Sequence, residues 1–377
     1  MIHITDRADC CGCTACAAVC LHGAVSMRAD AMGFRYPAVN ADLCVECGLC
    51  ERVCPFNNGY DKSRNIAPTS YAVRHKDMNE VTSSRSGAAF IALSDRILEE
   101  GGSVYGAGWS GHFTVTHKRA ASRQERDGFK GSKYVQSDMD GIIRQVREDL
   151  GKGLSVMFSG TPCQVAGVKS AIGKQLAGHL VTVDIICHGV PSPAVWKDYL
   201  GWLEERRGSE IISVDFRDKR TFGWKAHRET YRFADGGTMH CKTFTALFYK
   251  HIMLRPSCGR CPFANMERPS DLTLGDFWGW EKAAPDMNKD DKGLSLLICN
   301  TEKGRALLER AMSDLHCKAV DIKDCLQPNL LHPSSISKDA PAFEKDYKAG
   351  GFRHILPIYM PEHGLRRLLQ QLKQLIK

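Results

Sequence analysis

Between positions 70 and 330, short continuous apolar runs alternate with longer segments in which apolar residues recur at helical spacing. Short apolar runs, which are typical of buried strands, lie at 103–109, 154–160 and 180–187. Segments with the character of helices lie at 84–101, 141–150, 165–173 and 194–208, the last after a Ser192–Pro193 cap. Strands that alternate with helices predict an α/β body with a largely parallel sheet.

The two ends of the chain differ from this body. Residues 1–60 are rich in cysteine and form a first predicted domain, which a linker over 57–70 joins to the body at 70–330. The tail over 331–377 contains a stretch, 364–377, that predicts an amphipathic helix packed on the body or on a partner, rather than on a membrane surface. The apolar face of this helix is formed by Leu365, Leu368, Leu369, Leu372 and Ile376.

The composition indicates a soluble globular protein, since 43% of the residues are hydrophobic and 25% are charged. We expect no signal segment and no membrane span, because the start of the chain is not basic-then-apolar and no apolar run approaches about 20 residues. The 17 cysteines then indicate metal ligands in a reducing compartment, and we expect a cytoplasmic protein.

Charge is distributed unevenly. Residues 1–60 hold four Arg and six Asp or Glu, a formal −2, whereas the rest of the chain holds 47 basic and 37 acidic residues, a formal +10. A basic body suits a phosphate-bearing cofactor, an acidic electron carrier or nucleic acid, and a solvated surface without a partner is the alternative. Nucleic acid is disfavoured, because no basic stripe with interleaved aromatic residues is present.

Two cysteine runs near the start share the spacing C-x2-C-x2-C-x3-C, which is the ligand run of bacterial iron–sulfur ferredoxins. In such runs the first three cysteines bind one cluster and the fourth crosses to the other. The spacing therefore predicts an α+β ferredoxin-like domain with two [4Fe–4S] clusters, and it disfavours zinc, whose C-x2-C pairs lie further apart. The predicted ligand sets are Cys10, Cys13, Cys16 and Cys54 for one cluster, and Cys44, Cys47, Cys50 and Cys20 for the other. Cys11 is then a bystander, and the alternative is that it takes the place of its neighbour Cys10.

A third set of cysteines lies in the body. Cys163 and Cys187 each follow a predicted strand, and Cys258 and Cys261 form a C-x2-C pair. Because ligands bind at the carboxyl ends of strands in an open α/β sheet, these cysteines are candidates for a third metal centre. On spacing alone, zinc on the C-x2-C pair or plain buried cysteines are equally compatible.

Three motifs, GTPCQVAG, CHGVPSP and SDLTLGDFWG, follow the two cysteine runs in order. Together with them, the chain up to about residue 330 resembles the β-subunit family of deazaflavin (coenzyme F-420) hydrogenases and dehydrogenases. The resemblance implies a flavin-binding α/β body that holds FAD with an iron–sulfur cluster near the flavin, but no particular substrate, because related proteins include ferredoxin-dependent reductases. It implies a third cluster on Cys163, Cys187, Cys258 and Cys261, with Cys241 in reserve and Cys299, Cys317 and Cys325 structural.

FAD has a pyrophosphate, which helix N-termini bind through free N–H groups. The predicted cofactor-binding residues are Ser84, Ser86 and Gly87 with Arg85 beside them, Lys133 and Tyr134, Gly160 and Thr161, and Asp276 with Trp278. The alternatives are an ordinary helix cap, an exposed loop and a core tryptophan. Residues 106–111 match G-x-G-x-x-G but precede a β-like segment, so we reject them as a dinucleotide fingerprint.

A reaction at a flavin also requires a proton donor, and histidine is a common one. The candidates are His112, His188 and His227, and His188, next to Cys187, is the preferred catalytic residue, although a structural role is common for a lone histidine.

The sequence thus predicts an iron–sulfur flavoprotein oxidoreductase that passes electrons between a ferredoxin or similar acidic carrier, its clusters and FAD. Its substrate would be a small organic molecule or a deazaflavin. The alternatives are an electron-transfer subunit of a larger redox complex without its own substrate, and a structural zinc or nucleic-acid-binding protein. A homo-oligomer is compatible both with the flavoprotein oxidoreductase and with the electron-transfer subunit.

Overall fold

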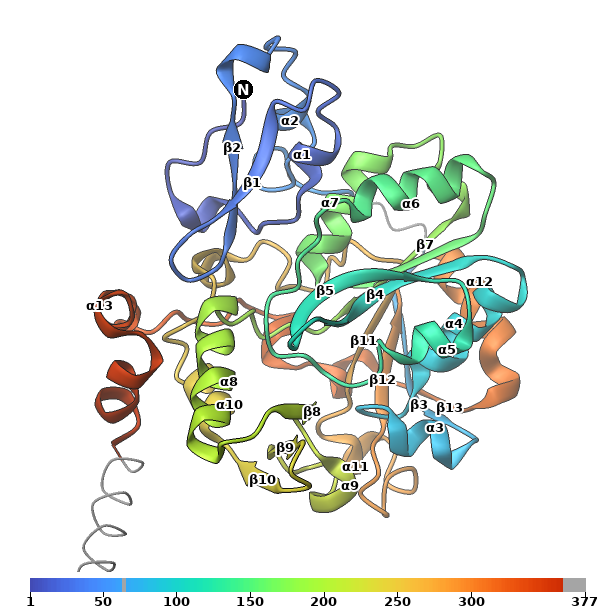
Figure 1. Cartoon of the computed structure of the whole chain (residues 1–377). Helices are drawn as coiled ribbons and strands as arrows, with labels where there is room; N and C mark the ends of the chain where they lie inside the picture. Colours follow the sequence, from blue (N-terminus) through green and yellow to red (C-terminus); the bar gives the residue numbers. More distant parts are fainter. Residues whose placement is uncertain (63–65, 362–377) are drawn as a thin grey trace, which may run out of the picture.

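The computed structural model describes residues 1–62 and 66–361, so the predicted helix at 364–377 lies outside the described residues. The first 60 residues form a small unit at one end of the molecule (Figure 1). It consists of a hairpin of β1 (Val25–Ala29) and β2 (Arg35–Val39) and two single-turn helices, α1 (Ala15–Ala18) and α2 (Leu49–Arg52).

The two cysteine runs fold alike. In each run a residue before the second cysteine and a residue after it have positive φ: Gly12 (71°) and Thr14 (66°) in the first, Glu46 (53°) and Gly48 (71°) in the second. Left-handed residues at these positions turn the chain tightly between successive cysteines. The repeated spacing therefore produces two equivalent loops, each followed by a one-turn helix.

The body is built on an 8-stranded sheet of order β13-β3-β12-β11-β7-β6-β4-β5. At its centre β11, β7, β6 and β4 are paired in parallel, and the other pairings are antiparallel. Since β3 also runs in their direction, most strands share one direction, as predicted, although β5, β12 and β13 oppose it and make the sheet mixed. The strand bounds are β3 (Thr69–His75), β4 (Ser103–Ser110), β5 (Thr114–Ala120), β6 (Val156–Gly160), β7 (Leu180–Ile185), β11 (Leu272–Asp276), β12 (Ser295–Cys299) and β13 (Leu315–Val320).

Helices cover both faces of this sheet, which is why its central strands are continuous apolar runs. On one face α6 (Ile142–Gly151) and α7 (Pro162–Ile172) pack with Val156 and Phe158. On the other, α4 (Ala89–Glu99) and α12 (Glu302–Ala311) pack with Met157. The predicted helix at 84–101 begins only at Ala89, because Ala88 has φ 62° and the preceding residues leave the helical conformation.

A second lobe carries its own aromatic core. Its three-stranded antiparallel sheet is formed by β8 (Ile211–Asp215), β9 (Glu229–Phe233) and β10 (Thr238–Cys241), and its helices by α8 (Pro193–Arg207), α10 (Thr243–Tyr249) and α13 (Ala340–Tyr359), which kinks at Gly350 and Gly351. Ser192 caps α8 and Pro193 opens it, as predicted. The shorter helices are α3 (Met78–Ser83), α5 (Arg123–Asp127), α9 (Lys219–Phe222) and α11 (Trp280–Ala283).

Residues 106–111 end β4 and enter the turn to β5, so the rejection of a dinucleotide fingerprint there is confirmed. Within residues 1–62 and 66–361, no helix combines the length and the apolar character that crossing a bilayer requires.

Candidate functional site

Cysteines of the two N-terminal runs meet in space, and their roles as cluster ligands stay a prediction. Cys10, Cys13 and Cys54 all lie near enough to Cys16 to raise the pKa of its thiol, although burial is the larger cause. We call Cys10, Cys13, Cys16 and Cys54 the inner set. Cys54, which comes from the second run, therefore joins the first run in space.

The other four cysteines, Cys20, Cys44, Cys47 and Cys50, form the outer set. Cys50 is buried beside Ile2 and Val25, with Cys20 packed against the same small core. Cys47 is exposed, and so are Leu43 (49%) and Val45 (58%) on either side of Cys44. The outer set therefore reaches the surface at Cys47, whereas Cys50 is buried.

Four thiols per set fit a [4Fe–4S] cluster by donor chemistry, because such clusters are held by four cysteine thiolates. Among the described residues, no group of three or more His, Cys, Asp or Glu side chains is arranged to hold a single metal ion. In a cube, each thiolate binds a different iron atom, so the ligands surround a larger space than those of one ion.

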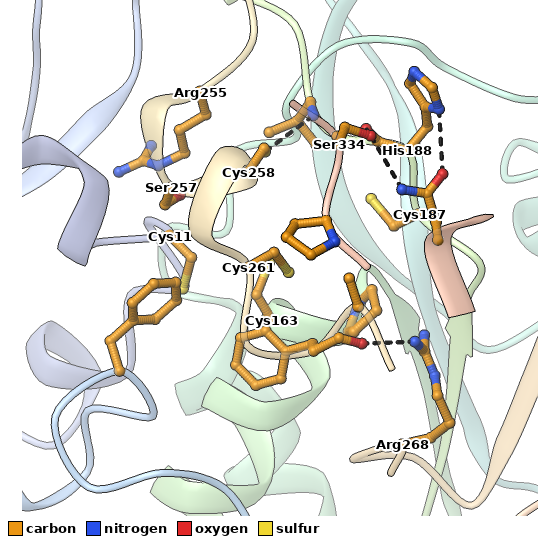
Figure 2. A pocket seen from close by; sticks show the side chains of 18 residues that line it. Cys11, Cys163, Cys187, His188, Arg255, Ser257, Cys258, Cys261, Arg268 and Ser334 are labelled. Carbon is orange, nitrogen blue, oxygen red and sulfur yellow. Dashed lines mark hydrogen bonds between the residues drawn. The ribbon is translucent and has the colours of Figure 1, made fainter. Parts of the chain in front are cut away.

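The third set of cysteines converges on one cavity (Figure 2). Cys163 lies in the first turn of α7, Cys187 follows β7, and the 3-10 helix Pro256–Arg260 (η4) brings Cys258 and, at its end, Cys261. We call these four the cavity set. The structure thus brings together the residues that the resemblance implied, at the carboxyl ends of parallel strands, and their role as ligands stays a prediction.

Cys11 is a fifth cysteine in the lining of this cavity. Its buried thiol bonds to both Cys13 and Cys163, which raises the pKa of Cys11 well above its usual value. The bond from Cys11 lowers the pKa of Cys163 to about 7, with burial opposing and a bond to the Thr161 hydroxyl (3.2 Å) assisting. Cys11 is therefore a contact between the inner set and the cavity set.

Burial favours the neutral form of the remaining cavity thiols. It raises the pKa of Cys258 and of Cys261 to about 12, and raises that of Cys187 well above its usual value. The amide of Val190 donates a 3.4 Å bond to the Cys258 sulfur. Buried thiols of this kind bind as thiolates only when a metal centre supplies the compensating positive charge, so the set fits an iron–sulfur cluster.

The reserve candidate and the structural candidates lie elsewhere. Cys241 is in β10, where its sulfur contacts the Tyr199 hydroxyl (3.2 Å) and the Glu229 carboxylate (3.3 Å). Cys299 and Cys325 are buried in hydrophobic cores, and Cys317 lies in β13.

A polar cluster occupies the carboxyl end of β11. Asp276 is paired with Arg217 (2.5 Å) and Arg85 (3.7 Å), and Arg217 also bonds to the Tyr134 hydroxyl (3.4 Å). Burial alone would raise the pKa of Asp276, but the two guanidinium groups outweigh it and lower the pKa. The buried Nε atoms of Arg85 and Arg217 have no hydrogen-bond partner within the described chain.

The predicted phosphate-binding segment Ser84–Gly87 contains residues whose polar groups have partners and one whose hydroxyl has none within the described part of the chain. Ser86 donates to the Leu294 carbonyl (2.7 Å) and the amide of Gly87 to the Ser295 hydroxyl (3.0 Å). A Cβ at Gly87 would lie 2.2 Å from the Val73 carbonyl oxygen, so this glycine serves close packing on the sheet. Ser84, in contrast, has a buried hydroxyl without a partner among the described residues, which fits a ligand in its neighbourhood.

At the other two predicted phosphate-binding sites, Lys133 and Gly160–Thr161, the polar groups already have partners within the protein. Lys133 donates to the carbonyls of Phe129, Lys130 and Gly131 (3.3, 3.0 and 3.3 Å), and burial lowers its pKa to about 8. Lys133 lies in a loop and is half-buried, and its role in FAD binding stays a prediction. Thr161 caps α7 in a reciprocal pair with Gln164, directly after Gly160.

The three histidines are separated. His112 pairs with Glu204 at the surface (2.7 Å). His188 lines the cysteine cavity and contacts His251 (2.6 Å) and Asn329 (3.2 Å). His227 lies beside the polar cluster, where burial and the two arginines lower its pKa to about 4.

Sequence reasoning missed Arg217, Lys219 and Arg255. Burial lowers the pKa of Lys219 to about 7, and its ammonium donates to the carbonyls of Ser86 (2.9 Å) and Lys292 (2.7 Å). The segment FRDKR after a predicted strand was the one available signal for the first two, and Arg255 had none.

The cysteine sets and the sheet define an iron–sulfur electron-transfer protein. Residues 9–58 match the family of 4Fe-4S dicluster domains. Residues 153–324 match the family described as the C terminus of the beta subunit of coenzyme F420 hydrogenase/dehydrogenase. The chain thus joins a 4Fe-4S dicluster domain to a domain of this beta-subunit family, and the predicted resemblance is confirmed.

Among solved structures, the chain is similar to a chain of the xenon-derivatised F420-reducing [NiFe] hydrogenase complex from Methanosarcina barkeri. The sequence identity is 18%, the match covers 76% of this chain and 94% of that chain, and the TM-score is 0.47. No curated protein matches the chain significantly.

Proposed function

We propose that the protein is an iron–sulfur flavoprotein oxidoreductase that exchanges electrons between a one-electron carrier and FAD through three [4Fe–4S] clusters. The observation that carries the proposal is the continuous series of cysteines from the surface to the carboxyl edge of the sheet. The outer set is exposed at Cys47, and the inner set touches the cavity set through Cys11.

The packing of the sets supports this order. Cys16, Cys20, Cys50 and Cys54 pack around one small core, so the outer and inner sets are neighbours. A Cβ at Gly167 of α7 would lie 2.7 Å from the Cys13 sulfur, so the inner set rests on the helix that carries Cys163. Electron transfer over such contacts needs no moving part.

FAD, when bound, stores two electrons and exchanges a hydride, which joins one-electron carriers to two-electron substrates. The chain's own groups would hold it at the polar cluster. Ser84 and Arg217 have donors without a hydrogen-bond partner among the described residues, and Nε of Arg85 lies 3.7 Å from the Asp276 carboxylate; such donors suit the phosphates or the ring oxygens of a flavin.

Two groups of residues would serve the substrate and the carrier. His188 lines the cysteine cavity, where its imidazole would exchange a proton with the substrate. Leu43 and Val45 would contact a ferredoxin-type carrier beside the outer set. The substrate would be a small organic molecule or a deazaflavin, the latter in keeping with the name of the matching family.

The test uses anaerobically purified full-length chain. Mixing with a reduced ferredoxin in a stopped-flow instrument should bleach the iron–sulfur absorption first and the flavin absorption second. Bleaching of clusters with no flavin present would instead favour an electron-transfer subunit of a larger redox complex. A colourless protein that retains stoichiometric zinc would contradict both.

A further inference from the structure

Arg255 is a buried cation with no anionic partner in the described protein. Its side chain is only 1% exposed, and it donates to the carbonyls of Cys10 (2.7 Å) and Arg35 (2.9 Å) and to the amide oxygen of Gln136 (2.9 Å). Its guanidinium carbon lies 4.3 Å from the ring centre of Tyr36. Within residues 1–62 and 66–361, Arg255 forms no ion pair with a carboxylate.

Other buried arginines of the chain are neutralised. Arg126, which is 1% exposed, pairs with Asp95 at 2.6 Å, and Arg268, which is 2% exposed, pairs with Asp184 at 3.0 Å. Burial of a charge without a counter-charge is costly, so a buried guanidinium held only by neutral acceptors indicates that negative charge is supplied from elsewhere.

Arg255 lies between the inner set and the cavity set. Its Nη2 atom is 3.6 Å from the Cys10 sulfur, and its side chain contributes to the lining of the cysteine cavity. Its backbone carbonyl accepts a 2.9 Å bond from the amide of Cys258, so η4 holds both residues in one rigid turn. Figure 2 shows Arg255 and Cys258 on this turn, with Cys11 beside it.

The loop of the first cysteine run is shaped to admit this side chain. A Cβ at Gly12 would lie 2.8 Å from Nη1 of Arg255, and Gly12 has φ 71°. A residue with a side chain there would meet both the guanidinium and an unfavourable backbone conformation. The cysteine loop and the arginine therefore fit each other closely.

We infer that Arg255 is the shared counter-charge of the inner set and the cavity set, and that it raises the reduction potentials of both above that of the outer set. The inference rests on the proposed function. A four-thiolate [4Fe–4S] cluster is negatively charged and gains one more negative charge on reduction. A nearby positive charge and an N–H···S bond therefore both favour the reduced form.

The consequence is directional. An electron taken up at the exposed outer set would move to the inner set and the cavity set, and would stay beside the polar cluster until a second electron arrives. Arg255 exchanges no electron or proton in this scheme, so it is a positioning residue and not a catalytic one. A purely mechanical role, fastening the N-terminal unit to the body, would leave the potentials unchanged.

The test is a redox titration of the anaerobic holoprotein, followed by the paramagnetic resonance signals of the separate clusters. Arg255→Gln removes the charge, Arg255→Lys keeps it, and Gln136→Glu places a carboxylate within 2.9 Å of Nη1 without removing the arginine. Arg126→Gln is the matched control, because it removes a buried arginine that lies against α4 on the far face of the sheet.

We expect Arg255→Gln and Gln136→Glu to shift the reduction potentials of the clusters on the inner set and the cavity set downward, with a smaller shift for the cluster on the outer set. Arg255→Lys and Arg126→Gln should stay near the wild-type values. Unmoved potentials in Arg255→Gln, or an equal shift of all three clusters, would overturn the inference while leaving the proposed function intact. If Arg255→Gln loses iron, Gln136→Glu decides in the same way, and a wild-type protein without clusters would overturn the proposed function itself.

Discussion

Replacement of Gly167 by alanine is expected to damage the inner set, although Gly167 lies in the middle of α7, where alanine normally stabilises. The added Cβ would lie 2.6 Å from the Cys13 Cβ and 2.7 Å from its sulfur. Carbon atoms in contact prefer about 3.5–4.0 Å, so the methyl group intrudes by about 1 Å. Cys13 or the helix must move.

The magnitude follows from two opposed effects. Alanine in a helix interior gains about 0.5–1 kcal/mol over glycine. Overpacking of a filled site costs about 1–3 kcal/mol. The free energy of unfolding should therefore fall by up to about 2.5 kcal/mol, and iron content should fall by up to about four atoms per chain if Cys13 no longer binds.

The assay is urea unfolding and iron analysis of anaerobic protein. Gly201→Ala in α8 is the matched control, because Gly201 is a helical glycine with no heavy atom within 4 Å of its added Cβ. This control should be neutral or slightly stabilising and should keep its iron. If the two variants behave alike in both measurements, the contact between α7 and the inner set is looser than these distances indicate.

Three further outcomes are expected. Cys187→Ala should slow or abolish flavin reduction while the N-terminal clusters remain reducible in stopped-flow mixing; unchanged flavin reduction would place Cys187 outside the route. Arg268→Met should lower the free energy of unfolding by about 3–5 kcal/mol, since it leaves the fully buried Asp184 unpaired, and adding Asp184→Asn should recover much of this, as urea unfolding would show. His117 donates through Nε2 to the Ser159 carbonyl (3.0 Å), and burial lowers its pKa to about 4. His117 therefore contributes up to about 3 kcal/mol to the free energy of unfolding above about pH 6.5, and this contribution is lost as the pH falls toward about 4. His117→Gln should flatten the pH dependence of the free energy of unfolding, and an unaltered slope would contradict this.

The cysteine sets were predictable because their signal is local. Ligand spacing within each run defines the loop, and the strand ends at Cys163 and Cys187 follow from short apolar runs. The central parallel strands followed from the same runs. The antiparallel strands β12 and β13 were not predicted, because short β segments do not reveal which neighbour they pair with.

The polar groups around the sets were harder to predict, since their partners are distant in sequence. Arg217 meets Asp276 across 59 positions, and Arg255 meets Cys10 across 245. No local pattern encodes such pairs. Ser84 has a buried hydroxyl without a partner among the described residues, whereas Gly87 allows close packing against β3, and binding of FAD at this segment stays a prediction.

The central claim is that the cysteine sets carry iron–sulfur clusters beside a flavin, and cofactor analysis of anaerobically purified full-length protein tests it most directly. We predict roughly twelve iron atoms with matching sulfide per chain, from three four-iron clusters, and non-covalent FAD released on denaturation. About eight iron atoms would remove the cavity cluster. Stoichiometric zinc in place of iron, or iron with FMN or no flavin at all, would contradict the account.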